Sequence, residues 1–133
     1  MKVYVFGNKD SPIDKKAFSV ARKLKTVFPQ IEFVEVGMNA DLPFELNDPA
    51  IIIDTIDGID KVELIKNCDL DKLINTRSSS VHDFDLGFQL KYLNKLGKLG
   101  NIAIIGIPVK KRISYLRIQS ILRKLVAQDM QGS

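Results

Sequence analysis

The chain has one cysteine and one histidine, and it has no apolar run long enough to cross a bilayer. The single cysteine, Cys68, cannot form a disulfide within the chain. A membrane-spanning helix needs about 20 consecutive apolar residues, and neither such a run nor an N-terminal apolar segment is present. We therefore expect a soluble, cytoplasmic protein without internal disulfides.

Several catalytic motifs are also missing. No segment matches a Walker loop or the G-x-G-x-x-G fingerprint, so nucleotide binding has no motif support. The G-x-S-x-G nucleophile elbow is absent, and a Ser-His-Asp triad would have to pair His82 with a serine from 78–80. Residues so close in sequence rarely point at each other productively. Cys68 has no nearby base, so we expect an ordinary half-buried thiol there.

The length and composition indicate one compact domain over residues 1–133. With 133 residues and 45% hydrophobic content, the chain can build a core without a disulfide or a structural metal. The formal net charge is +4, with the basic residues denser in the C-terminal third. Nucleic acid is one possible partner for Lys110-Lys111-Arg112 and the basic residues after them. No recognition motif accompanies these charges, and we favour a solvated helix face.

The pattern of apolar residues predicts alternating strands and helices. Strands are expected over 2–6, 31–36, 50–54, 61–66 and 101–107, and helices over 12–28, from about 82 to 96, and over 113–127. Residues 37–49 read as a loop and 128–133 as a frayed tail. The isoleucine-rich strands have the composition of parallel strands covered on both faces, whereas 61–66 alternates like an antiparallel edge strand. The expected fold is a three-layer α/β/α sandwich with a mostly parallel, twisted central sheet of about five strands.

An aspartate, Asp54, closes the isoleucine-rich strand predicted over 50–54. In open α/β sheets, ligands bind in the crevice at the C-terminal ends of the strands. This places Asp54 at the edge of the sheet where function is expected. Aspartate also favours turns, so a role as a strand-ending turn residue is an equally good interpretation.

The only histidine, His82, lies at the entrance of a predicted helix. Ser80 and Asp83 form an S-x-x-D capping box around it. The free N–H groups and the helix dipole disfavour an imidazolium in the first turn, and a neutral imidazole can bind a metal. A polar surface residue near a cap is the simpler interpretation. Asp14 likewise stands three residues after Ser11, as the acidic member of a capping box would.

Asp14, Asp54 and His82 each follow an element that delivers them to the same edge of a parallel sheet. Their separate interpretations as cap and turn residues do not predict this shared placement. One imidazole and two carboxylates form a donor set suited to a divalent transition metal. We therefore predict a metal site made of these three residues.

Four segments of the chain resemble the hydrogenase maturation endopeptidases in order and spacing. They are Gly7-Asn8 with the acid that opens the next helix, Ile51–Asp54, Ser79–Leu86 and Ile104–Pro108. The most specific is the S-S-x-H-D-F-D-L run of Ser79–Leu86, joined to the later I-I-G-I strand. The resemblance covers nearly the whole chain.

The resemblance implies a cytoplasmic endopeptidase that removes a C-terminal extension from the large-subunit precursor of a nickel-iron hydrogenase after nickel insertion. It also implies that Asp14, Asp54 and His82 contact nickel, which the substrate carries. No side-chain nucleophile has a credible partner, so attack by water on a metal-polarised carbonyl is the favoured chemistry. No membrane or nucleic-acid partner is expected.

The chain departs from the family at the start of the first helix. The family usually shows two adjacent acids and then a G-x-G pattern, whereas this chain reads Ile13-Asp14-Lys15-Lys16-Ala17. The second acid is kept, but the first acid and both glycines are lost. Ala17 is still small enough for close helix–sheet packing. The alternative function is therefore a diverged, non-catalytic module that holds a hydrogenase subunit or a metal in the same crevice.

Overall fold

The computed structural model describes residues 1–7, 15–37, 42–45, 47–70 and 89–132. Its sheet has five strands in the order β2-β1-β3-β5-β4. The strands are β1 (Lys2–Phe6), β2 (Glu32–Val36), β3 (Ala50–Ile56), β4 (Glu63–Lys66) and β5 (Ile102–Pro108). All neighbours are parallel except β4, which runs antiparallel to β5 at the edge. The mostly parallel sheet and its antiparallel edge strand confirm the predictions.

The two isoleucine-rich strands, β3 and β5, lie side by side in the sheet. All seven residues of β3 pair with β5, from Ala50 opposite Ile102 to Ile56 opposite Pro108. Every residue of β5 is buried, and only Ile51 of β3 is partly exposed. Strands buried on both faces are expected where helices or loops cover both sides of a parallel sheet.

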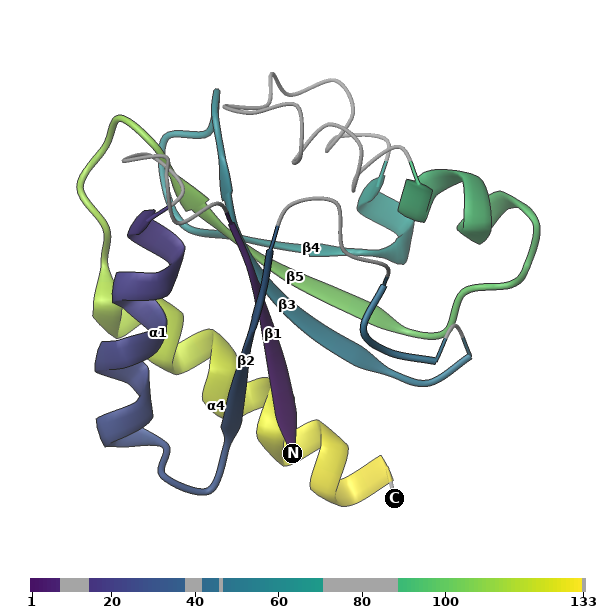
Figure 1. Ribbon diagram of the computed structural model, residues 1–133, viewed down its shortest axis with the longest axis horizontal. Coiled ribbons are helices and arrows are strands. Elements are labelled where there is room, and N and C mark those ends of the chain that lie inside the picture. The colour runs from purple at the N-terminus through teal and green to yellow at the C-terminus, as the bar shows by residue number, and fades with distance from the viewer. Residues whose placement is uncertain (8–14, 38–41, 46, 71–88, 133) are drawn as a thin grey trace.

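Two helices, α1 (Lys15–Val27) and α4 (Tyr115–Gly132), cover one face of the sheet (Figure 1). They also touch each other, since Lys23 Nζ of α1 lies 4.5 Å from the ring centroid of Tyr115. Both carry a buried apolar stripe, as amphipathic helices do. The buried residues of the two helices are Ala17, Phe18, Val20, Ala21, Leu24, Ile118, Leu122 and Leu125.

The opposite face is covered by the 3-10 helix η1 (Asn67–Asp69), the helical residues 89–95 and the loop around Phe44. Figure 1 shows η1 and the helical segment on the side of the sheet away from α1 and α4. Leu70 and Leu90 are buried against Ile52 and Ile104 there. The predicted three-layer α/β/α sandwich is therefore confirmed. No helix in the described ranges is both long and apolar enough to cross a membrane.

Several predicted boundaries and faces are wrong. β3 continues to Ile56, two residues beyond its predicted end. Helix α4 continues to Gly132, five residues beyond its predicted end at 127, because no proline or glycine interrupts the chain before Gly132. Val27 is 41% exposed and Leu116 is 78% exposed, so these two apolar residues lie off the buried stripes of α1 and α4. Cys68 is exposed in η1 rather than half-buried.

One side chain, Asn67, joins the layer formed by η1 and residues 89–95 to the sheet. Its Nδ2 donates to Asn94 Oδ1 at 3.0 Å and to the Gly100 carbonyl at 2.9 Å. Its Oδ1 accepts from the Ile102 backbone N–H at 2.8 Å. One amide thus joins η1, the helical segment and the start of β5.

Asn67→Ala should lower the free energy of unfolding by roughly 1–3 kcal/mol, because it leaves part-buried donors and acceptors unsatisfied. Urea unfolding followed by circular dichroism measures the change. Asn101→Ala, which removes an exposed amide from the same region, is the matched control and should shift stability by less than about 0.5 kcal/mol. Equal effects of the two substitutions would contradict the role assigned to Asn67.

Candidate functional site

Asp54 is an acid inside the most buried part of the sheet. It lies in β3 between Ile52 and Ile56, on the face that η1 and the helical residues 89–95 cover. Only 2% of Asp54 is exposed, and its Oδ1 accepts the Thr55 backbone N–H at 2.9 Å. The carboxylate is therefore held by the backbone of its own strand.

The interpretation of Asp54 as a turn residue is wrong. The turn that ends β3 lies at Asp57-Gly58, where Gly58 has a φ of 94°. Asp54 instead pairs with Gly106 inside the β3–β5 ladder. Burying a carboxylate costs several kcal/mol unless it is well solvated by protein groups, so the fold alone does not favour this residue. A buried acid near the carboxyl edge of a parallel sheet is typical of a functional site.

The neighbours of Asp54 in the sheet are apolar or lack a side chain. Val5 pairs with Ile53, so the buried Phe6 lies level with Asp54 on β1. On the other side, a Cβ on Gly106 would lie 2.8 Å from Ile56 Cδ1. The glycine of the I-I-G-I strand therefore makes room for the isoleucine that ends β3. These surroundings lower the local dielectric around the carboxylate.

The start of α1 lies at the same edge as the end of β5. Lys16 Nζ donates to the backbone carbonyl of Val109, and a second carbonyl, that of Pro108, lies 3.5 Å from it. The strands β1, β3 and β5 are parallel, so their carboxyl ends share this edge. We call it the carboxyl edge. Asp14 directly precedes Lys15, the first residue of α1.

Of the three predicted metal ligands, the structure places only Asp54. Asp14 and His82 lie outside the described residues, and the convergence of the three remains a prediction. Within the described part of the chain, no three His, Cys, Asp or Glu side chains gather closely enough to hold a metal. Any metal site that uses Asp54 therefore needs donors from 8–14, 38–41, 46 or 71–88, or from a bound substrate.

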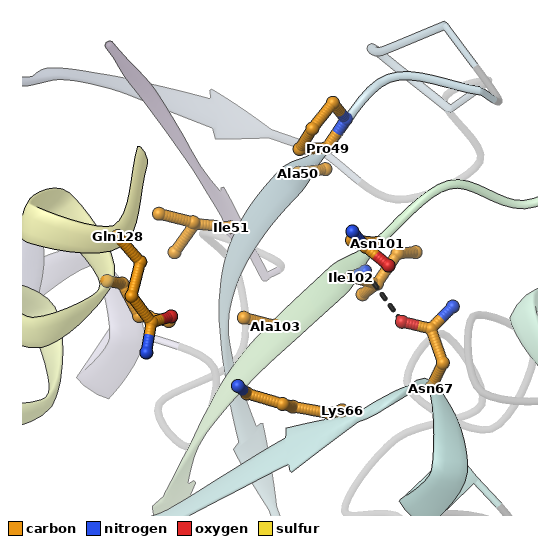
Figure 2. A pocket seen from close by; sticks show the side chains of 10 residues that line it. Pro49, Ala50, Ile51, Lys66, Asn67, Asn101, Ile102, Ala103 and Gln128 are labelled. Carbon is orange, nitrogen blue, oxygen red and sulfur yellow. Dashed lines mark hydrogen bonds between the residues drawn. The ribbon is translucent and has the colours of Figure 1, made fainter. Parts of the chain in front are cut away.

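A cavity of about 620 Å³ lies at the opposite edge of the sheet, where β3 and β5 begin (Figure 2). Segments 49–51, 66–67 and 101–103 line it together with the C-terminal part of α4. Ala50, at its wall, is four residues before Asp54, about 13 Å along an extended strand. Among the described residues of its wall, Lys66 is the only charged one, and none is a carboxylate, histidine or cysteine. Asp54, and not this cavity, therefore offers acid–base or metal chemistry.

Sequence reasoning did not find this cavity. Its wall comes from four segments that are far apart in the sequence, and none of them carries a motif. Asn67, whose Oδ1 accepts the Ile102 N–H in Figure 2, contributes to the wall and to the fold at once. No signal in the sequence brings these segments together before the sheet topology is known.

Comparison with known proteins supports the fold. The sequence matches no protein-family model and no curated protein. The structure is similar to the solution structure of an endopeptidase from Escherichia coli, with a TM-score of 0.59 and 16% identity over 99% of this chain and 94% of that one. A hydrogenase 2 maturation peptidase from Thaumarchaeota archaeon SCGC_AB-539-E09 aligns over 99% of both chains with a TM-score of 0.45 and 18% identity. The likeness to the E. coli endopeptidase shows a shared fold.

Asp54→Asn should leave the free energy of unfolding unchanged or raise it by up to about 2 kcal/mol. The amide oxygen can still accept the Thr55 N–H, while the penalty for burying a charge is removed. Chemical denaturation of the two proteins measures the difference. Asp60→Asn, at an exposed position, is the matched control. If Asp54→Asn, but not Asp60→Asn, lowered the free energy of unfolding by more than about 2 kcal/mol, the Asp54 carboxylate would be identified as a stabilising group.

Proposed function

We propose that the protein is an endopeptidase that removes the C-terminal extension from the large-subunit precursor of a nickel-iron hydrogenase. The observation that carries the proposal is the buried Asp54 near the carboxyl edge of a sheet whose fold is shared with an E. coli endopeptidase. The resemblance of Ser79–Leu86 to the maturation endopeptidases supports the choice of substrate. The reaction takes place in the cytoplasm after nickel insertion.

In this mechanism the nickel arrives as part of the substrate. Asp54, Asp14 and His82 bind the nickel of the precursor and thereby bring the scissile peptide bond to the carboxyl edge. Two carboxylates offset the charge of the ion, and a neutral imidazole is a good nickel ligand. The apolar neighbours of Asp54 strengthen its attraction to the cation by lowering the local dielectric.

The bond is broken by water. The metal polarises the scissile carbonyl, the water oxygen adds to the carbonyl carbon, and the C–N bond then breaks. The proton released by the water goes to the leaving amine. Three protein ligands leave the other coordination positions of the ion to groups of the precursor. Only a precursor that already carries nickel is therefore bound with its scissile bond at the carboxyl edge.

The isolated protein should hold nickel weakly, because the remaining ligands come from the substrate. Purified protein that is loaded with nickel and dialysed against a chelator should retain far less than one ion per chain. Elemental analysis of the dialysed protein measures this. Nickel that stays at one ion per chain would identify a resident cofactor and overturn recognition of substrate nickel.

His82→Ala and Asp54→Asn should each slow cleavage of a nickel-loaded precursor by about 100-fold or more, since each removes a proposed ligand. The substrate is a large-subunit precursor encoded in the same genome, and the mobility shift on a gel reports cleavage. Asp60→Asn is the control, and circular dichroism shows whether each variant is folded.

The outcomes of this assay separate the two candidate functions. Cleavage by both ligand variants at the wild-type rate would contradict the assignment of the site. If the wild-type chain binds the precursor but never cleaves it, the protein is the non-catalytic binding module. That result would fit the loss of the family's first acid and of both its glycines in the run Ile13-Asp14-Lys15-Lys16-Ala17.

A further inference from the structure

A group of basic residues lies at the carboxyl edge, and none of them pairs with another described residue. Lys110, Lys111 and Arg112 form the connection between β5 and α4, and all three are exposed. Lys15, also exposed, begins α1, which the bond from Lys16 to Val109 holds beside this connection. Figure 1 shows the β5–α4 connection passing the first turn of α1. We call these four residues the basic rim.

Neighbouring basic residues have structural partners, in contrast to the basic rim. Lys16 bonds to the end of β5, Arg117 Nε donates to the Val62 carbonyl at 2.6 Å, and Lys23 lies over the Tyr115 ring. The ion pair of Lys2 with Glu32 lies at the opposite edge of the sheet, where β1 and β2 begin. No described carboxylate therefore neutralises the basic rim.

The basic rim lies within reach of a peptide bound at Asp54. Asp54 pairs with Gly106 on the adjacent strand, and neighbouring strands are about 4.8 Å apart. Lys110 follows Gly106 by four residues, which span at most roughly 14 Å. The rim therefore begins within roughly 19 Å of Asp54, a distance that about six residues of extended peptide cover.

We propose that the basic rim binds an acidic segment of the substrate, located within about six residues of the bond presented at Asp54. This inference rests on the proposed endopeptidase function and specifies its substrate. Exposed charge pairs of this kind accelerate encounter and select the partner, and salt weakens them.

An acidic peptide fits this surface better than nucleic acid does. The four cations gather in one short connection and one helix end, whereas a nucleic-acid strand is usually bound along a basic groove with aromatic rings for stacking. The aromatic ring nearest in sequence, Tyr115, is already covered by Lys23.

The probe for the test is a fluorescent peptide of alternating glutamate and glycine, and fluorescence anisotropy measures its Kd. The variant K110Q/K111Q/R112Q should weaken binding by about tenfold, the effect of losing a few exposed charge pairs. Raising the salt should reduce the difference. The matched control K25Q/K95Q/K98Q removes three exposed charges from the opposite edge of the sheet and should change Kd by less than about twofold.

Two outcomes would overturn the inference. An equal loss in both triple variants would show that only net charge matters. A single-stranded DNA oligomer of equal charge that binds more tightly, and depends on the same three residues, would identify a nucleic-acid surface.

Cleavage of the precursor distinguishes failure of this inference from failure of the proposed function. If wild-type protein cleaves and the rim variant shows an unchanged KM, the basic rim has no role and the endopeptidase assignment stands. If no cleavage occurs but the acidic peptide binds through the rim, the surface is real and the endopeptidase assignment fails.

Discussion

The parallel pairing of β3 with β5 is the interaction on which the rest of this structure depends. It joins the two most apolar segments of the chain along the full length of β3, and it buries side chains on both faces of the sheet. Each face then needs a cover, which α1 and α4 provide on one side and η1 with residues 89–95 on the other. The same pairing defines the carboxyl edge, where β5 ends, the connection with Lys110, Lys111 and Arg112 follows, and α1 begins.

Asp54 is the one charged residue in the paired strands β3 and β5, and its burial links the fold to the proposed function. Asp54 and Thr55 are the only polar residues among those described that are fully buried. A carboxylate in such a place lowers stability unless other groups compensate, and an aliphatic residue would continue the isoleucine pattern without that penalty. A carboxylate that binds a metal ion gains from the same low dielectric that makes its burial unfavourable.

Much of the fold could be predicted from the sequence, because the isoleucine runs mark strands that are buried on both faces. The end of β3 could not be predicted, because aspartate is common in turns and Asp54 therefore suggests that the strand ends there. In the structure, Thr55 and Ile56 continue to pair with Ile107 and Pro108. The helical period alone also fits more than one face of α4, in which Ile118 is buried whereas Leu116 is exposed. The cavity depends on segments that only the sheet topology brings together.

For the site, the sequence predicted that Asp54 lies near the carboxyl edge, and the structure adds that it is buried inside the strand. Its meeting with Asp14 and His82 is proposed from spacing and from the resemblance. Anomalous diffraction at the nickel edge, from crystals soaked in nickel, tests this meeting directly. We predict one nickel position about 2 Å from an Asp54 oxygen, with Asp14 and a His82 nitrogen as further ligands. Nickel bound elsewhere, or a His82 that lies beyond reach of an ion at Asp54, would contradict it.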